Sequence, residues 1–190
     1  MIPFNHLGIV FNTFGTFIYP RSVRTALCTF LQPLPSQSKV LDIGAGTGIL
    51  CQFSNECRED LCFVAVDPAE GMMKYAKAYV QTHKASAEAL PFENDSFDVA
   101  LMGESLHHFS DVDESLKETV RVLKSRGKLF IYDFDVNTFL GKSICRLEVL
   151  LGEPGNFFTS HSLKEKLETY GFRVNITKHG WRYTVDAVKI

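Results

Sequence analysis

Four short apolar runs, separated by segments with helix-like spacing, follow one another from residue 39 onward. The runs are KVLDI, LCFVAVD, FDVALMG and KLFIYDF. They show little alternation between apolar and polar positions, which is typical of strands covered on both faces. The intervening segments predict helices over residues 48–57, 69–81 and 111–124. This alternation favours βαβ units around a parallel sheet, and therefore an α/β fold.

The chain has 190 residues, enough for one substantial core but too few for two independent ones. We therefore predict a single domain over residues 1–190. Residues 1–36 carry apolar residues at helix-like spacing and end in the proline-containing stretch QPLPSQS. We expect this segment to form a helical flap over the ligand site, and residues 136–159, with a helix and then a turn, to form an insertion over the same site.

The last part of the chain predicts one more helix and two closing strands. SHSLKEKLETYGF reads as an amphipathic helix with Ser160 or Ser162 as N-cap and Gly171 just past its end. FRVNIT and WRYTVDAVKI, joined by KHG, predict two strands linked by a tight turn.

Composition excludes several classes of protein. The net charge of −2 provides no basic field for nucleic acid. No run of about 18 apolar residues could span a bilayer, and the first residues lack the pattern of a signal peptide, so we expect no stable membrane insertion and a cytoplasmic location. The five cysteines form an odd set without a CxxC pair, which argues against a disulfide framework and a structural zinc site. We expect most of them to be buried.

A glycine-rich loop follows the first predicted strand, in the stretch VLDIGAGTGIL. Its glycines, Gly44, Gly46 and Gly48, have the spacing GxGxG. Such a loop lets a ligand approach the backbone, because glycine adopts positive φ and leaves N–H groups accessible. The dinucleotide fingerprint GxGxxG requires glycine where this chain has Ile49. Asp42 also places a negative charge where a pyrophosphate would be repelled.

An aspartate ends the second predicted strand. Asp67 can accept hydrogen bonds from both hydroxyls of a ribose, a need that NAD shares with other adenosyl ligands. The alternative is a helix N-cap, since Pro68 and Ala69 follow it. The proximity of the glycine loop favours ribose binding.

Four ordered motifs resemble those of the class I S-adenosylmethionine-dependent methyltransferases, in particular the ubiquinone and menaquinone branch. They are VLDIGAGTG, VAVDPAEGMMKYAK, ASAEALPFENDSFDVALMGESLHHF and ESLKETVRVLKSRGKLFIYDF. The resemblance implies a Rossmann-like three-layer sandwich with a seven-stranded, mostly parallel sheet and an antiparallel last strand near residues 183–189. It also implies S-adenosylmethionine as cofactor and methyl transfer to a small-molecule acceptor.

The same resemblance implies roles for residues of the loop and the first strands. Gly44, Ala45 and Gly46 would line the methionine moiety and the sugar. Asp42 would hold the loop and reach the cofactor ammonium, directly or through water. Asp67 would bind the ribose hydroxyls.

Further along the chain, the resemblance implies contacts with the adenine and the ammonium. Pro68 and Met72 would lie near the adenine. Ser86 stands where the family commonly has an aspartate, and as a neutral acceptor it should bind the adenine amino group less strongly. The backbone N–H of Ala87 would meet the ring, and the carbonyl of Gly103 would meet the cofactor ammonium.

Histidine in GESLHHF is the candidate catalytic group. In some small-molecule methyltransferases a histidine matching His107 acts on the acceptor, and an imidazole suits proton transfer. The alternative role for His107 is to orient a loop. His107 and His108 are adjacent, so on a helical turn their side chains should diverge by roughly 100°, and we expect no shared metal site.

Two other functions remain open from the sequence. One is a noncatalytic S-adenosylmethionine-binding protein or subunit, because binding and catalysis use different residues. The less favoured one is an NAD-dependent oxidoreductase, against which Ile49 and Asp42 argue. We expect a monomer or homodimer, and the sequence does not name the methyl acceptor.

Overall fold

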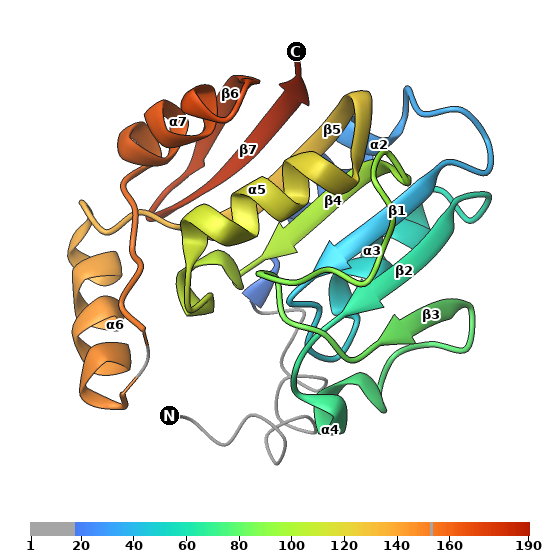
Figure 1. Cartoon of the computed structure of the whole chain (residues 1–190). Helices are drawn as coiled ribbons and strands as arrows, with labels where there is room; N and C mark the ends of the chain where they lie inside the picture. Colours follow the sequence, from blue (N-terminus) through green and yellow to red (C-terminus); the bar gives the residue numbers. More distant parts are fainter. Residues whose placement is uncertain (1–17, 153) are drawn as a thin grey trace.

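Seven strands form one sheet at the centre of the protein (Figure 1). The structure is a computed structural model that describes residues 18–152 and 154–190. In sheet order, the strands run β3-β2-β1-β4-β5-β7-β6. Their bounds are β1 Lys39–Ile43, β2 Cys62–Val66, β3 Val80–His83, β4 Phe97–Gly103, β5 Leu123–Phe134, β6 Phe172–His179 and β7 Arg182–Lys189.

Parallel pairing joins β3, β2, β1, β4 and β5, whereas β7 pairs antiparallel with both β5 and β6. The four apolar runs all form strands, and the closing residues form the predicted pair of strands. The mostly parallel, seven-stranded sheet with an antiparallel last strand is confirmed.

Helices cover both faces of the sheet, which gives three layers (Figure 1). In one outer layer α2 packs against α3, and in the other lie α5 and α7. The helix bounds are α2 Arg21–Leu31, α3 Ile49–Cys57, α4 Glu70–Met73, α5 Val112–Val122, α6 Phe139–Leu150 and α7 Ser160–Thr169, with a 3₁₀ turn η1 at Leu106–His108.

Successive residues of the central strands bury their side chains in opposite layers. On β4, Val99 and Leu101 join the core beneath α2 and α3, whereas Ala100 and Met102 join the core beneath α5 and α7. This is the period of two expected of a strand, with both faces apolar because both are covered. The lack of polar alternation that predicted these strands therefore has its cause in the two helical layers.

The predicted helix over residues 69–81 is wrong in extent. Only Glu70–Met73 is helical, and Val80–His83 forms the edge strand β3. The sequence VQTH is short and polar, and only Val80 is buried, so the strand is defined by its pairing with β2. The N-cap of α7 is Thr159, not a serine, although Ser162 completes a capping box with it.

The predicted flap over residues 1–36 is described only in part, because residues 1–17 lie outside the described residues. Residues 21–31 of it form α2, whose Val23, Leu27 and Phe30 are buried in the core against the sheet. The insertion over residues 136–159 contains the predicted helix, α6, which stands beside the sheet layers (Figure 1).

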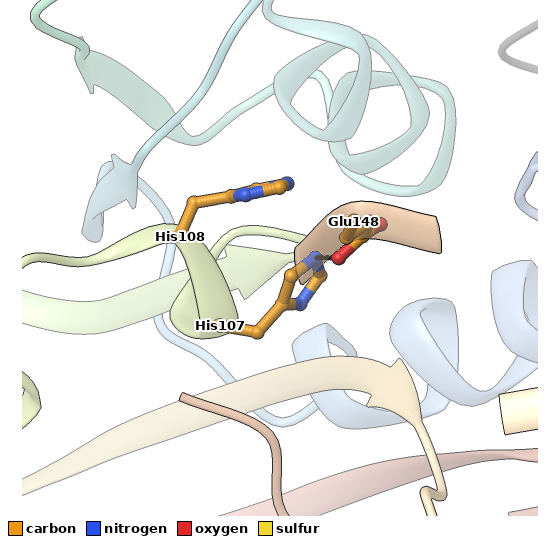
Figure 2. Close-up of side chains that lie close together, drawn as sticks. All are labelled: His107, His108 and Glu148. Carbon is orange, nitrogen blue, oxygen red and sulfur yellow. Dashed lines mark ion pairs between the residues drawn. The ribbon is translucent and has the colours of Figure 1, made fainter. Parts of the chain in front are cut away.

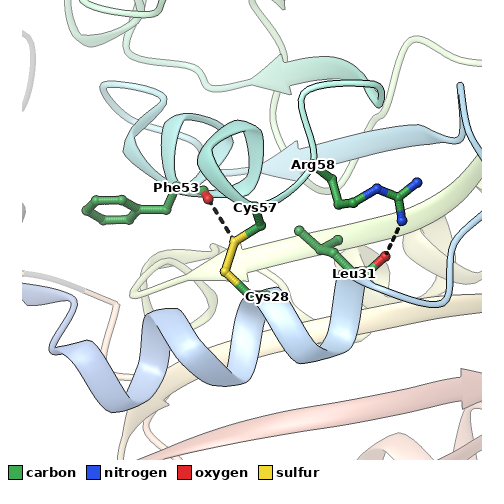
Figure 3. The surroundings of a disulfide bond; sticks show 5 residues. All are labelled: Cys28, Leu31, Phe53, Cys57 and Arg58. Carbon is green, nitrogen blue, oxygen red and sulfur yellow. Dashed lines mark hydrogen bonds between the residues drawn. A yellow bond between two sulfur atoms is a disulfide. The ribbon is translucent and has the colours of Figure 1, made fainter.

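A disulfide joins α2 to α3, contrary to the prediction (Figure 3). Cys28 and Cys57 have a Cα–Cα distance of 5.2 Å. Of the remaining cysteines Cys51 is buried, Cys62 is exposed and Cys145 is half-buried, so the expectation of mostly buried cysteines was also wrong. Cysteine spacing did not reveal the pair because packing of two helices separated in sequence brings the two side chains together.

Candidate active site

The carboxyl ends of β1, β2, β4 and β5 meet at one edge of the sheet, because these strands are parallel. The glycine loop leaves β1 at this edge. Gly44, Gly46 and Gly48 have φ of 70°, 54° and 73°, a conformation that residues with a Cβ rarely adopt. A Cβ on Gly44 would also lie 2.7 Å from Cβ of Ser105, so both backbone shape and space require glycine there.

Asp67 connects this loop to the segment after β2. One carboxylate oxygen accepts a hydrogen bond from the Gly46 N–H at 2.8 Å, and the other accepts one from the Ala69 N–H at 2.7 Å. The side chain is nearly buried, and burial raises the pKa of Asp67 despite these two bonds. A carboxylate offers about four acceptor positions, so each oxygen keeps one position for a further donor. Asp67 is not the N-cap of α4, which is Ala69, but its hydrogen bonds tie the glycine loop to the segment that leads into that helix.

Asp42 lies beneath the glycine loop and is only 1% exposed. Cys51 Sγ, on α3, donates to its carboxylate at 3.4 Å. Burial raises the pKa of Asp42 to about 7, more than the Cys51 hydrogen bond lowers it. Asp42 therefore ionises less readily than an exposed aspartate.

Of the residues assigned to the adenine side, Met72 lies against the same loop. Met72 is buried, and its Cε would lie 3.4 Å from a Cβ on Gly46, so it packs against the loop. Pro68 is exposed, Ser86 is half-buried and Ala87 is buried.

A carboxylate that the sequence analysis did not single out holds the segment around Ser86. Glu88 accepts hydrogen bonds from the Ser110 N–H at 2.8 Å and the Asp111 N–H at 3.1 Å, and its pKa is lowered because these bonds and one from Ser86 outweigh the effect of burial. The residues 86–88 are thereby fixed to the start of α5.

Beyond Gly103 lies a buried group of charged side chains. A Cβ on Gly103 would clash with the Tyr19 hydroxyl, so the end of β4 is closely covered. Glu104 has a left-handed backbone with φ of 53°, and its carboxylate pairs with Arg182 Nε at 3.3 Å. Burial raises the pKa of Glu104 to about 7, although Arg182 acts in the opposite direction.

His107 is 2% exposed and lies between two carboxylates. Its Nδ1 is 2.9 Å from Asp133 on β5, and its Nε2 is 3.5 Å from Glu148 on α6. Burial alone would lower the pKa of His107, but Asp133 and then Glu148 raise it to about 9. The imidazole therefore carries a proton at neutral pH. Sequence reasoning missed Asp133, Glu148 and Arg182, because no local pattern relates them to the GESLHHF motif.

His108 lies closer to His107 than predicted. The two ring centroids are 4.1 Å apart. The helical turn sets only the directions of the Cα–Cβ bonds, and the side-chain torsions bring the rings together again. Figure 2 shows Glu148 beside these two rings, and one nitrogen or oxygen atom from each of the three side chains lies within 4.8 Å of the others. The two side chains therefore do not diverge as predicted.

Comparison with known proteins gives one consistent family. Residues 41–131 match the family model described as a methyltransferase domain. The uncharacterized methyltransferase YcgJ of Bacillus subtilis is 32% identical over 123 residues, which cover 58% of this chain and 44% of that protein. The ubiquinone/menaquinone biosynthesis C-methyltransferase UbiE of Rickettsia massiliae is 33% identical over 175 residues, covering 85% of this chain and 65% of that protein.

Solved structures share the fold. The crystal structure of a SAM-dependent methyltransferase from Thermotoga maritima, described as a possible histamine N-methyltransferase, has a TM-score of 0.76 at 24% identity, with 99% of each chain covered. The chain covers 42–65% of the length of these curated relatives. Within the described residues, no helix is both long and apolar enough to cross a membrane. The matched methyltransferase domain, the YcgJ and UbiE relatives and the shared fold support a class I S-adenosylmethionine-dependent methyltransferase.

Proposed function

We propose that this protein transfers the methyl group of S-adenosylmethionine to a small molecule. The observation that carries the proposal is the glycine loop hydrogen-bonded to Asp67 at the carboxyl edge of the sheet. In open α/β sheets ligands bind at this edge, where strand order changes direction. Here β1 lies between β2 and β4, so the loop after β1 is at that point.

The cofactor fits the donors and acceptors of this edge. The two remaining acceptor positions of Asp67 suit a pair of ribose hydroxyls, and Met72 offers an apolar surface beside the loop. We assign the adenine to the segment with Pro68, Ser86 and Ala87. Asp42 and the carbonyl of Gly103 are assigned to the ammonium of the methionine moiety.

The acceptor is assigned to the space next to η1, β5 and α6, where His107 would be the residue that acts on it. Phe157 of the insertion stacks against His107, with ring centroids 5.6 Å apart. Methyl transfer is an in-line displacement, so the main tasks of these residues are alignment of the acceptor and exclusion of water. The insertion over residues 136–159 supports both tasks because it supplies Glu148 and Phe157 to the same place.

The relatives differ in the acceptor that their names suggest: one is described as a C-methyltransferase and another as a possible N-methyltransferase. The test is therefore a screen with S-adenosylmethionine labelled at its methyl group against quinols, phenols, amines and small acids. Label in one acceptor class supports the proposal. Tight binding of S-adenosylhomocysteine without label in any class would instead favour a noncatalytic binding protein. The cytoplasmic location and the monomeric or homodimeric state stay predictions.

The role of His107 is tested by His107→Ala with the labelled acceptor. We expect turnover to fall by about 10²–10⁴-fold, the usual effect of losing a proton-transfer group. Affinity for S-adenosylhomocysteine should change little. His161→Ala, at an exposed position of α7, is the control. Unchanged turnover in His107→Ala would leave His107 with the loop-orienting role only.

A further inference from the structure

Three side chains with metal-binding atoms converge at the carboxyl end of β4. They are His107 and His108 from η1 and Glu148 from α6, and their ligand atoms all lie within 4.8 Å of one another (Figure 2). In a tetrahedral zinc site with bonds of about 2.1 Å, ligand atoms are roughly 3.4 Å apart. The three ligand atoms are therefore close to the spacing that one ion requires.

His107 is already oriented for this role. Its Nδ1 is held by Asp133 at 2.9 Å, and Asp133 is itself fixed by a hydrogen bond of 2.8 Å from the Phe134 N–H. The other ring nitrogen, Nε2, faces Glu148 at 3.5 Å. Metal-ligating histidines almost always use their second nitrogen to contact a carboxylate or carbonyl in this way. The Asp133–His107 pair thus has the arrangement of a supported metal ligand.

The charge of the surroundings favours a cation. The buried Asp133 and the half-buried Glu148 both face His107, and the half-buried Glu104 adds a third carboxylate, which pairs with Arg182 at 3.3 Å. A divalent ion bound between His107 and Glu148 would displace the Nε2 proton of His107 and take over the positive charge that faces Asp133 and Glu148.

We propose that His107 Nε2, His108 and Glu148 bind one divalent cation of the zinc class. Two imidazoles and a carboxylate suit zinc better than magnesium or calcium, which prefer oxygen ligands. Three protein ligands leave a coordination position open, as in catalytic zinc sites. If the proposed function holds, His107 acts on the acceptor through the ion, and the open position selects molecules with an oxygen able to occupy it.

The first test is calorimetric titration of the chelator-treated full chain with zinc chloride. We expect one ion per chain, with at least 100-fold weaker binding in His108→Ala and in Glu148→Gln. Asp133→Asn should weaken binding by about 10–100-fold, because it removes the support of His107 and not a ligand. Retention of wild-type zinc affinity in both ligand variants would overturn the proposal, as would absence of zinc binding by the wild type.

Controls separate this site from surface binding. His161 and Glu165 on α7 form an exposed pair at 3.3 Å, and Cys62 is an exposed thiol. His161→Ala and Cys62→Ser should each keep the zinc affinity, and loss of the ion in either would assign it to the surface instead. Cobalt substitution gives a second readout: the visible spectrum of a low-coordinate Co²⁺ should disappear in His108→Ala and in Glu148→Gln.

The variants also distinguish the two proposals. Affinity for S-adenosylhomocysteine should remain at the wild-type value in His108→Ala and Glu148→Gln, which confirms that they are folded. If the wild-type protein binds no zinc but transfers label to an acceptor, the metal site alone is overturned. If the protein binds zinc but no acceptor takes up label, the methyl-transfer proposal is overturned and the metal site stands.

Discussion

Replacement of Asp67 is the most direct test of the cofactor site. In the free protein its carboxylate accepts hydrogen bonds from the N–H groups of Gly46 at 2.8 Å and Ala69 at 2.7 Å. Hydrogen bonds to a charged group are each worth about 1.5–3 kcal/mol. Loss of two ribose hydrogen bonds in Asp67→Ala should therefore weaken cofactor binding by about 3–6 kcal/mol, which is at least a 100-fold rise in Kd.

The same substitution should also affect the empty protein. The Gly46 and Ala69 N–H groups lose their acceptor, but Asp67 is 9% exposed, so water can replace part of the lost hydrogen bonding. We expect a destabilisation of about 1–3 kcal/mol with the fold retained. Asp67→Asn keeps the shape and one accepting oxygen, so its Kd should lie between those of wild type and Asp67→Ala.

The assay is calorimetry with S-adenosylhomocysteine, with thermal unfolding measured on the same samples. Asp98→Ala is the matched control, because Asp98 also accepts a backbone N–H, that of Lys39, at 2.8 Å and lies at the opposite edge of the sheet. It should lose stability without loss of cofactor affinity. A folded Asp67→Ala protein with wild-type Kd would refute the assignment of this edge to the ribose.

Three further predictions concern the loop and the disulfide. Because burial raises the pKa of Asp42 to about 7, affinity for S-adenosylhomocysteine should increase between about pH 6 and pH 8 as the carboxylate ionises. Asp42→Asn should remove this pH dependence. A pH dependence that persists in Asp42→Asn would contradict the assignment of Asp42 to the ammonium. Gly44→Ala should lower both the melting temperature and the affinity for S-adenosylhomocysteine. Gly180→Ala is the control, because Gly180 has a similar φ of 69° and an added Cβ would meet no atom within 4 Å. It should cost only about 1–2 kcal/mol of backbone strain and leave the affinity unchanged. Reduction of the Cys28–Cys57 disulfide should destabilise the protein by about 3–4 kcal/mol, because the bond closes a loop between cysteines 29 residues apart. Denaturant unfolding with and without reductant measures this difference. Equal stability under both conditions would show that the bond does not form.

Local patterns were sufficient for the central strands and the cofactor loop. The run FDVALMG predicted β4 because two helical layers leave no polar face on it, and the glycines of VLDIGAGTG marked a turn that all three enter with positive φ. The edge strand Val80–His83 could not be predicted in this way, because its residues are mostly polar and its conformation depends on hydrogen bonds to β2. Local sequence also suggested a serine cap for α7, where the neighbouring Thr159 forms the cap.

The sequence by itself determined the class of the fold and the position of the glycine loop, because strand periodicity and positive-φ glycines are properties of neighbouring residues. Only the tertiary structure brought Asp133 and Glu148 to His107, and Cys28 to Cys57. These contacts join separate elements, and their geometry depends on strand order, helix packing and side-chain torsions. The chemistry proposed at the acceptor side rests on those long-range contacts, whereas the proposed cofactor side rests on a single loop and the aspartate of the next strand.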